Sequence, residues 1–184
     1  MNPQKTIVIA NQKGGLGKTT VAQNVGYCIS QTGRKTLLID LDPQQNLGKT
    51  FNVDTVSSVA DVLSGNSAEP VQINNSNLSI LPAGPNLSVY LAKMADDIDL
   101  LFPLREYVKS LSDYSVIIID TPPTLVGLTL AGLRDTIPDV LSDGGFTETA
   151  LLIGDHDGFL GIHSSCSWFL CFLQENLHKK AILG

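Results

Sequence analysis

A glycine-rich loop near the N-terminus carries the residues best suited by type and spacing to do chemistry. Glycines let a backbone wrap closely around phosphate oxygens with its N–H groups pointing inward, and a following helix N-terminus adds positive potential. Lys18 can reach the β- and γ-phosphates of a nucleotide, the Thr19 hydroxyl can ligate Mg²⁺, and Thr20 can lie near the α-phosphate. The alternative is a glycine turn that only precedes a helix. The loop comprises Lys13, Gly14, Gly15, Leu16, Gly17, Lys18, Thr19 and Thr20.

Three carboxylates follow predicted buried strands. Asp40 and Asp42 come after the apolar residues 36–39, and Asp120 follows the run 114–119. Ligands of open α/β sheets bind at the carboxyl ends of the strands. We therefore expect these carboxylates and the glycine-rich loop to converge in space. Each carboxylate could instead bond local N–H groups, as a strand-end cap for Asp40 and Asp42 or as a helix cap for Asp120.

Apolar runs that alternate with helical patterns must position these groups. Short runs rich in β-branched residues are typical of strands buried on both faces of a parallel sheet. Their alternation with helices predicts an α/β fold, a mostly parallel sheet with helices on both faces. The expected strands are residues 6–10, 36–39, 78–81 and 114–119, the expected helices are residues 18–32, 56–63, 99–111 and 125–134, and residues 66–76 are expected to form an exposed polar loop.

Composition excludes several classes of protein. A chain of 184 residues can bury a real core, and we expect residues 1–184 to form a single domain. Its 43% hydrophobic and 16% charged residues exclude disorder of the whole chain. No apolar run approaches the roughly 18–20 residues of a membrane span, and the N-terminus lacks a secretory signal pattern. The three cysteines have no metal-ligand spacing and indicate reduced thiols in a cytoplasmic protein.

The net charge of −6 is unevenly distributed. Residues 1–134 hold 11 acidic and 10 basic residues, whereas residues 135–184 hold seven acidic and two basic residues. No basic stretch marks a nucleic-acid footprint. A sequence pI near 4.8 argues against strong non-specific DNA binding by this chain.

The glycine-rich loop departs from the standard P-loop pattern and resembles a known variant of it. Gln12 stands where the standard pattern has glycine, and Lys13 is a second lysine early in the loop. This arrangement resembles the deviant Walker A motif of the ParA/MinD superfamily, whose fold is P-loop NTPase-like. Asn11-Gln12, LLIDLDPQQN (37–46) and IIIDTPPTLVGLT (117–129) resemble further motifs of that superfamily, in the expected order. Together they cover about residues 5–134 and favour the ParA/Soj branch.

The resemblance implies a role for each matching residue. Lys13 would be the signature lysine that reaches the nucleotide of a dimer partner, with a solvated loop lysine as the alternative. Asp42 would orient the attacking water, Asp40 would lie near the metal shell, and Asp120 would be the Walker B carboxylate of Mg²⁺. The segment 121–123 would be switch II, a rigid turn that senses the γ-phosphate. The catalytic set is then Lys13, Lys18 and Asp42, and the metal set is Thr19, Asp40 and Asp120.

The resemblance also implies a function. The chain would bind ATP and Mg²⁺, hydrolyse ATP slowly by in-line attack of water, and switch between states as an ATP-dependent homodimer in plasmid or chromosome partition. Its partners would be a centromere-binding adaptor protein and non-specific DNA, the latter weakened by the acidic C-terminal part. The alternatives are a MinD-like positioning ATPase, a synthetase of the same superfamily, and a truncated inactive paralogue. The iron-protein branch is disfavoured because no cysteine lies between residues 29 and 165.

The resemblance weakens after Arg134. Residues 150–178 show neither a strand nor a helix period, and the apolar run 168–173 predicts a buried helix, with an aggregation-prone tail or a membrane anchor as the alternatives. Residues 155–157 (Asp-His-Asp) predict a polar loop rather than a metal site. Members of the family usually continue well past the point that corresponds to Gly184. A fragment, a truncated gene product and a divergent short member all remain open.

Overall fold

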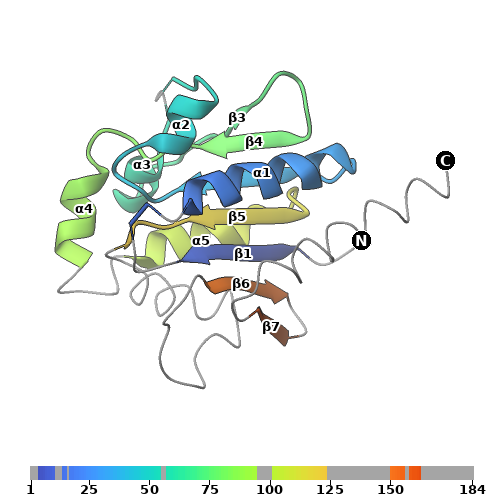
Figure 1. The fold of residues 1–184 in the computed structure, drawn as a ribbon. Coiled ribbons are helices and arrows are strands. Elements are labelled where there is room, and N and C mark those ends of the chain that lie inside the picture. Colours follow the sequence, from blue (N-terminus) through green and yellow to red (C-terminus); the bar gives the residue numbers. More distant parts are fainter. Residues whose placement is uncertain are drawn as a thin grey trace, which may run out of the picture.

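All the strands in the described part of the chain belong to one sheet. The computed structural model describes residues 4–10, 14–15, 17–54, 57–94, 101–123, 150–155 and 158–162. Within these residues the sheet has seven strands in the order β3-β4-β2-β5-β1-β6-β7 (Figure 1). The strands are β1 (Lys5–Ala10), β2 (Thr36–Asp40), β3 (Val71–Gln72), β4 (Leu78–Leu81), β5 (Val116–Asp120), β6 (Ala150–Asp155) and β7 (Gly158–Ile162).

The middle of the sheet is parallel and its two edges are antiparallel. β5 pairs in parallel with both β1 and β2, and β2 pairs in parallel with β4. β3 pairs antiparallel with β4 at one edge. At the other edge β6 pairs antiparallel with β1, and β7 pairs antiparallel with β6.

The described helices pack on both faces of this sheet. α1 (Lys18–Gln31) and α2 (Asn46–Thr50) lie on one face, whereas α3 (Val59–Leu63), α4 (Leu87–Met94) and α5 (Phe102–Ser110) lie on the other (Figure 1). Local signals define the helix ends. Gly33, with φ of 83°, follows the end of α1, Ser58 and Asp61 form a capping box on α3, and Pro103 lies in the first turn of α5.

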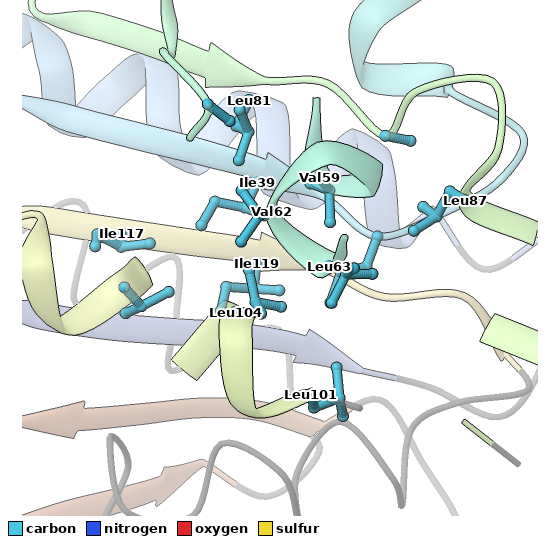
Figure 2. Close-up of a cluster of buried hydrophobic side chains, with 14 of the residues drawn as sticks. Ile39, Val59, Val62, Leu63, Leu81, Leu87, Leu101, Leu104, Ile117 and Ile119 are labelled. Atoms are coloured by element: carbon cyan, nitrogen blue, oxygen red, sulfur yellow. The ribbon is translucent and has the colours of Figure 1, made fainter. Parts of the chain in front are cut away.

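Alternation along the strands divides the core into two clusters. Successive side chains of a strand point to opposite faces of the sheet. Ile39 and Ile119 thus pack with Val62 and Leu104 against α3 and α5, as Figure 2 shows. Leu38 and Ile118 point the other way and pack with Ala22 and Val25 of α1. The parity of each strand therefore decides which of its terminal residues face α1.

The expected elements compare with the structure as follows. The strand at residues 78–81 is confirmed with its bounds, and the other three strands and the helices at 18–32 and 99–111 are confirmed with shifted ends. The helix expected at 56–63 begins at Val59, and residue 56 lies outside the described part of the chain. The exposed loop at 66–76 was wrong in part, because β3 forms there.

Other expectations fall on residues that the structure leaves undescribed. These are the helix at 125–134 and the apolar helix at 168–173, so both stay predictions, as does the single domain over residues 1–184. The absence of a strand pattern in residues 150–178 was misleading, because β6 and β7 form a hairpin there. Asp155 ends β6, and the remainder of the predicted polar loop at 155–157 is undescribed. Among the described helices none has the length and apolar character needed to cross a membrane.

Candidate functional site

The ends of three neighbouring strands place two carboxylates side by side. Asp120 of β5 is in register with Ile9 of β1 on one side and with Asp40 of β2 on the other. Asp40 shares the parity of Leu38, and Asp120 shares that of Ile118, so both carboxylates lie on the face that α1 covers. The sequence-based expectation that these strand ends converge is thereby confirmed.

The glycine-rich loop leads into α1 with a backbone shape that suits glycine. Gly15 and Gly17 have φ of 73° and 77°, in the left-handed region that side chains disfavour. Gly17 is the N-cap residue of α1, and no side chain of the described residues caps the helix there. The first N–H groups of a helix lack partners within the helix, so this end attracts anions. Lys13 and Leu16 lie outside the described residues.

The Thr19 hydroxyl contacts the Asp120 carboxylate. Thr19 Oγ1 donates a hydrogen bond of 2.6 Å to Asp120 Oδ2. This contact joins the first turn of α1 to the end of β5. Asp120 is 1% exposed, and its Oδ1 is buried without a hydrogen-bond partner among the described residues. An orphaned buried carboxylate oxygen is a position that a cation or an ordered water would fill.

The environment of Asp120 is electrostatically unfavourable to its charge. Burial raises the pKa of Asp120 to about 6, the charge of Asp42 acts in the same direction, and the hydrogen bond from Thr19 and the charge of Lys18 oppose the rise. Lys18 is itself only 7% exposed. A divalent cation beside Asp120 would favour the ionised carboxylate and reverse this trend.

Asp40 differs from Asp120 in its bonding. It is fully buried, and both of its oxygens accept backbone N–H groups: Oδ1 from Asp42 at 2.9 Å and Oδ2 from Leu47 at 3.2 Å. Burial raises the pKa of Asp40 to about 7, the N–H groups lower it, and the charges of Asp120 and Asp42 raise it. The sequence left two roles open for Asp40, a strand-end cap that bonds local N–H groups and a place near the metal shell. The bonds seen here are those of the strand-end cap.

Asp42 lies in a tight turn beyond the end of β2. Its Oδ1 accepts the N–H of Gln44 at 2.9 Å, and its carbonyl oxygen accepts the N–H of Gln45 at 2.9 Å. Gln45 has φ of 57° and is the N-cap residue of α2. The Asp42 side chain is partly exposed, so its carboxylate remains within reach of solvent.

The segment 121–123 is anchored to β1. Thr121 is fully buried, and its hydroxyl donates a hydrogen bond of 2.9 Å to the carbonyl oxygen of Ile9. A Cβ atom added to Gly14 would have Pro123 Cγ as its nearest neighbour, at 4.0 Å. The segment therefore lies against the glycine-rich loop, which is the position that a switch in contact with phosphates needs.

The structure brings together most of the predicted site residues and adds a group that sequence reasoning missed. Gly14, Gly15, Gly17, Lys18, Thr19 and Thr20 form the loop and the start of α1, and Asp40, Asp42 and Asp120 line the adjacent strand ends. Sequence reasoning missed Gln45, whose Nε2 donates to the carbonyl oxygen of Gly84 at 3.4 Å and ties the Asp42 turn to the segment after β4. The Asp-Pro pair at 42–43 is a turn signal that could have drawn attention to this segment.

The donor set at this edge of the sheet fits Mg²⁺ and a nucleotide phosphate chain. Mg²⁺ is usually held by one or two carboxylates together with waters and phosphate oxygens. Thr19 and Asp120 supply hard oxygen atoms, one of them the orphaned Oδ1. The part of the chain that the structure describes holds no group of three or more His, Cys, Asp or Glu placed for a metal, so a dedicated all-protein cage is absent there.

Sequence comparisons agree with this arrangement. Residues 4–138 match the protein family described as AAA domain. The chromosome-partitioning ATPase Soj of Treponema pallidum (strain Nichols) is 39% identical over 137 residues, which cover 70% of this chain and 53% of the relative. The sporulation initiation inhibitor protein Soj of Bacillus subtilis (strain 168) is 34% identical over 137 residues, covering 70% and 54%. The chain thus spans about half the length of the curated relatives it matches.

Comparisons with solved structures confirm the predicted P-loop NTPase-like fold. A plasmid partition protein from Borrelia burgdorferi matches with a TM-score of 0.61 and 29% identity, covering 72% of this chain and 61% of that chain. Cobyrinic acid a,c-diamide synthase from Mycobacterium smegmatis, with bound ADP and magnesium, matches with a TM-score of 0.62 and 35% identity, covering 71% and 56%.

Proposed function

We propose that the chain, which belongs to the ParA/Soj-type ATPases of the deviant Walker A superfamily, binds ATP with Mg²⁺ and hydrolyses it slowly. It would act in the cytoplasm as a dimer switch in plasmid or chromosome partition. One observation carries the proposal. The glycine-rich loop opens α1 at the point where the Thr19 hydroxyl meets the buried carboxylate of Asp120. A helix end suited to phosphate and a pair of oxygen donors suited to Mg²⁺ therefore lie together, which supports the proposal.

ATP binding would draw on the backbone more than on side chains. The phosphates would accept N–H groups of the loop from Gly14 to Gly17 and of the first turn of α1, in the field of the helix dipole. Lys18 would contact the β- and γ-phosphates, and Thr20 would lie near the α-phosphate. The positive φ of Gly15 and Gly17 supports this assignment, because it turns the backbone where phosphate must approach closely.

Thr19 and Asp120 would hold Mg²⁺, the first through its hydroxyl and the second directly or through water. The ion would offset the negative charge of the β- and γ-phosphates. The short contact between the two side chains supports this assignment, because it holds the two oxygen atoms 2.6 Å apart at the start of α1. Asp120 Oδ1 offers a further buried acceptor that has no partner among the described residues.

Hydrolysis would depend on two groups with different roles, Asp42 and Lys13. Asp42, which is partly exposed in a tight turn, would orient the attacking water. Lys13 would reach the nucleotide of the partner subunit and offset charge that develops during phosphoryl transfer, as an arginine finger does. The segment 121–123, packed against the loop, would respond to the γ-phosphate.

The proposed partners follow from the family. They are a second copy of the chain, a centromere-binding adaptor protein and non-specific DNA. Relatives named for chromosome partitioning support this assignment. The seven acidic and two basic residues of segment 135–184 predict that DNA binding is weak.

A calorimetric titration tests the nucleotide site. Mg·ATP is titrated into the full chain and into Lys18→Ala, with Lys109→Ala as the matched control because Lys109 is an exposed lysine that pairs with Glu106. We expect a dissociation constant in the micromolar range, weakened at least about tenfold by Lys18→Ala and unchanged by Lys109→Ala. Absence of binding by the unaltered chain, or equal binding by Lys18→Ala, would overturn the proposal.

A synthase function is the second candidate, and one observation favours it. The structure matches cobyrinic acid a,c-diamide synthase as well as it matches the plasmid partition protein. ATP hydrolysis that rises when DNA and an adaptor protein are added supports partition. A rate of ATP hydrolysis that does not change with DNA and rises only with a carboxylic acid and an amide donor supports the synthase function.

A further inference from the structure

Both carboxylate oxygens of Asp40 accept hydrogen bonds from the backbone of the segment that follows it. Oδ1 accepts the N–H of Asp42, at the start of the turn, and Oδ2 accepts the N–H of Leu47, in the first turn of α2. One buried side chain thus bonds both ends of segment 42–47. Asp40 has no exposed surface, so water does not compete for these bonds.

The neighbouring carboxylate is bonded in a different way. Asp120 accepts a side-chain hydroxyl on Oδ2 and has no partner among the described residues on Oδ1. Of these two carboxylates, only Asp120 combines a contact to Thr19 with an oxygen that has no partner among the described residues. The bonds of Asp40 are directed to the Asp42 turn instead.

We propose that Asp40 is a positioning residue, which holds the Asp42 turn in the geometry that water activation needs and which lies outside the metal shell. This inference rests on the proposed function, because it concerns the same hydrolysis. It replaces the place near the metal that the family resemblance implies for Asp40.

The structure of the Asp42 turn shows why the two bonds of Asp40, here called the clamp, matter. Asp42 presents its carboxylate from a turn in which Gln44 bonds back to Asp42, and Gln45 is held in a left-handed conformation and bonds the carbonyl oxygen of Gly84. Lys49 Nζ donates to the carbonyl oxygen of Gln44 at 2.7 Å from the exposed side. Asp40 supplies the buried side of this support. Releasing it would let the Asp42 carboxylate depart from its position by more than catalysis tolerates.

A carboxylate is the side chain that this role requires. Two N–H donors approach the two oxygens of Asp40, and above its pKa of about 7 the ionised carboxylate offers acceptors only. Asparagine at this position would keep one acceptor and turn an NH₂ group toward the other N–H. Asp40→Asn therefore removes one of the two bonds while it nearly preserves volume.

Amide exchange tests the clamp without any need for turnover. In nucleotide-free protein, we expect Asp40→Asn to speed hydrogen exchange at the amides of Asp42 or Leu47 at least about tenfold, with Ile118 in β5 unchanged. Asp61→Asn is the matched control, because Asp61 also accepts a backbone N–H, at 2.8 Å from Ser58, but in the capping box of α3. Unchanged exchange at both amides in Asp40→Asn would overturn the proposal.

A measurement on the unaltered chain applies even if Asp40→Asn does not fold. Scalar couplings across hydrogen bonds join the amide nitrogens of Asp42 and Leu47 to the carboxylate carbon of Asp40. We expect these couplings in nucleotide-free protein, and we expect them to persist when Mg·ADP is added. Their loss on addition of Mg·ADP would place Asp40 in the metal shell and overturn the proposal, and so would their absence from the nucleotide-free protein.

Hydrolysis kinetics separate positioning from metal binding. We expect Asp40→Asn to lower kcat at least about tenfold while KM for ATP and the Mg²⁺ activation constant change less than about threefold. In the Asp42→Asn background the same change should have little further effect, because Asp40 acts through Asp42. Independent losses, or a raised Mg²⁺ requirement like that of Asp120→Asn, would overturn the proposal. Failure of the unaltered chain to bind ATP would instead overturn the proposed function, and the exchange test would remain valid.

Discussion

Removal of the Thr19 hydroxyl should destabilise the nucleotide-free protein in a pH-dependent way. Thr19→Ala deletes the donor 2.6 Å from Asp120 Oδ2, and no other hydrogen bond to this carboxylate is present among the described residues. Above the pKa of Asp120, which burial raises to about 6, the variant leaves a buried charge without this bond. Below that pKa it leaves a neutral acid, whose burial costs less.

The size of the effect follows from the type of hydrogen bond. Bonds to charged groups contribute about 1.5–3 kcal/mol, and bonds between neutral groups about 0.5–1.5 kcal/mol. We expect Thr19→Ala to lower the free energy of unfolding by about 2 kcal/mol near pH 8 and by about 1 kcal/mol near pH 5. For a chain of this length, the loss near pH 8 corresponds to a fall in Tm of about 4–8 °C.

Urea unfolding at the two pH values measures this difference. Thr20→Ala is the matched control, because it makes the same substitution at the next position of α1, where the side chain is exposed. Thr19→Ser keeps a hydroxyl and should recover most of the loss. Equal losses at both pH values, or a serine variant as unstable as the alanine variant, would refute the reasoning.

Three further predictions concern the same site. Burial raises the pKa of Asp40 to about 7 and that of Asp120 to about 6, so the folded state binds protons that the unfolded chain releases, and the free energy of unfolding should fall as the pH rises from about 5 to 8. Urea unfolding without nucleotide checks this sign, and a rise over the same interval would contradict it. Gly15→Ala and Gly17→Ala should each lower the free energy of unfolding by about 1–2 kcal/mol, because φ is positive at both positions. Gly14→Ala, whose added Cβ would have its nearest neighbour at 4.0 Å, should lower it by less than half as much. Thermal unfolding compares the three variants, and equal losses would count against the argument. Removal of Mg²⁺ by EDTA should weaken ATP binding at least about tenfold in calorimetry, and an unchanged affinity would speak against a metal between protein and phosphates.

Local signals explain which parts of the fold could be predicted. The buried strands are short β-branched runs, and their pattern does not depend on distant residues. The strand at Leu78–Leu81 has a single β-branched residue, and it was predicted with its bounds because Pro82 stops the run. The convergence of Asp40 and Asp120 followed from the rule that parallel strands end at one edge, and the register confirms it.

Other parts depend on contacts that the sequence does not display. α2 (Asn46–Thr50) has only five residues, too few for a hydrophobic period, and Asp40 bonds its first turn. The β6–β7 hairpin carries glycines at 154, 158 and 161, which obscure any alternation of polar and apolar residues. In addition, β6 pairs antiparallel with β1, which is distant in the sequence. The sequence left a local cap at Asp40 open as an alternative, but the bond from the N–H of Leu47 could not be foreseen, because it requires α2 to be in place.

The rung that joins the three central strands near their ends has a consequence for how this chain can change in evolution. Ile9, Asp120 and Asp40 share one rung of the sheet. Insertion of a single residue within β2 or β5 would displace its carboxylate along the strand by about 3.3 Å and rotate it to the opposite face. Insertions in the turns at the other end of the strands leave this rung intact. Length variation should therefore be tolerated in those turns and eliminated from the strands, even where the inserted residue is apolar and fits the core.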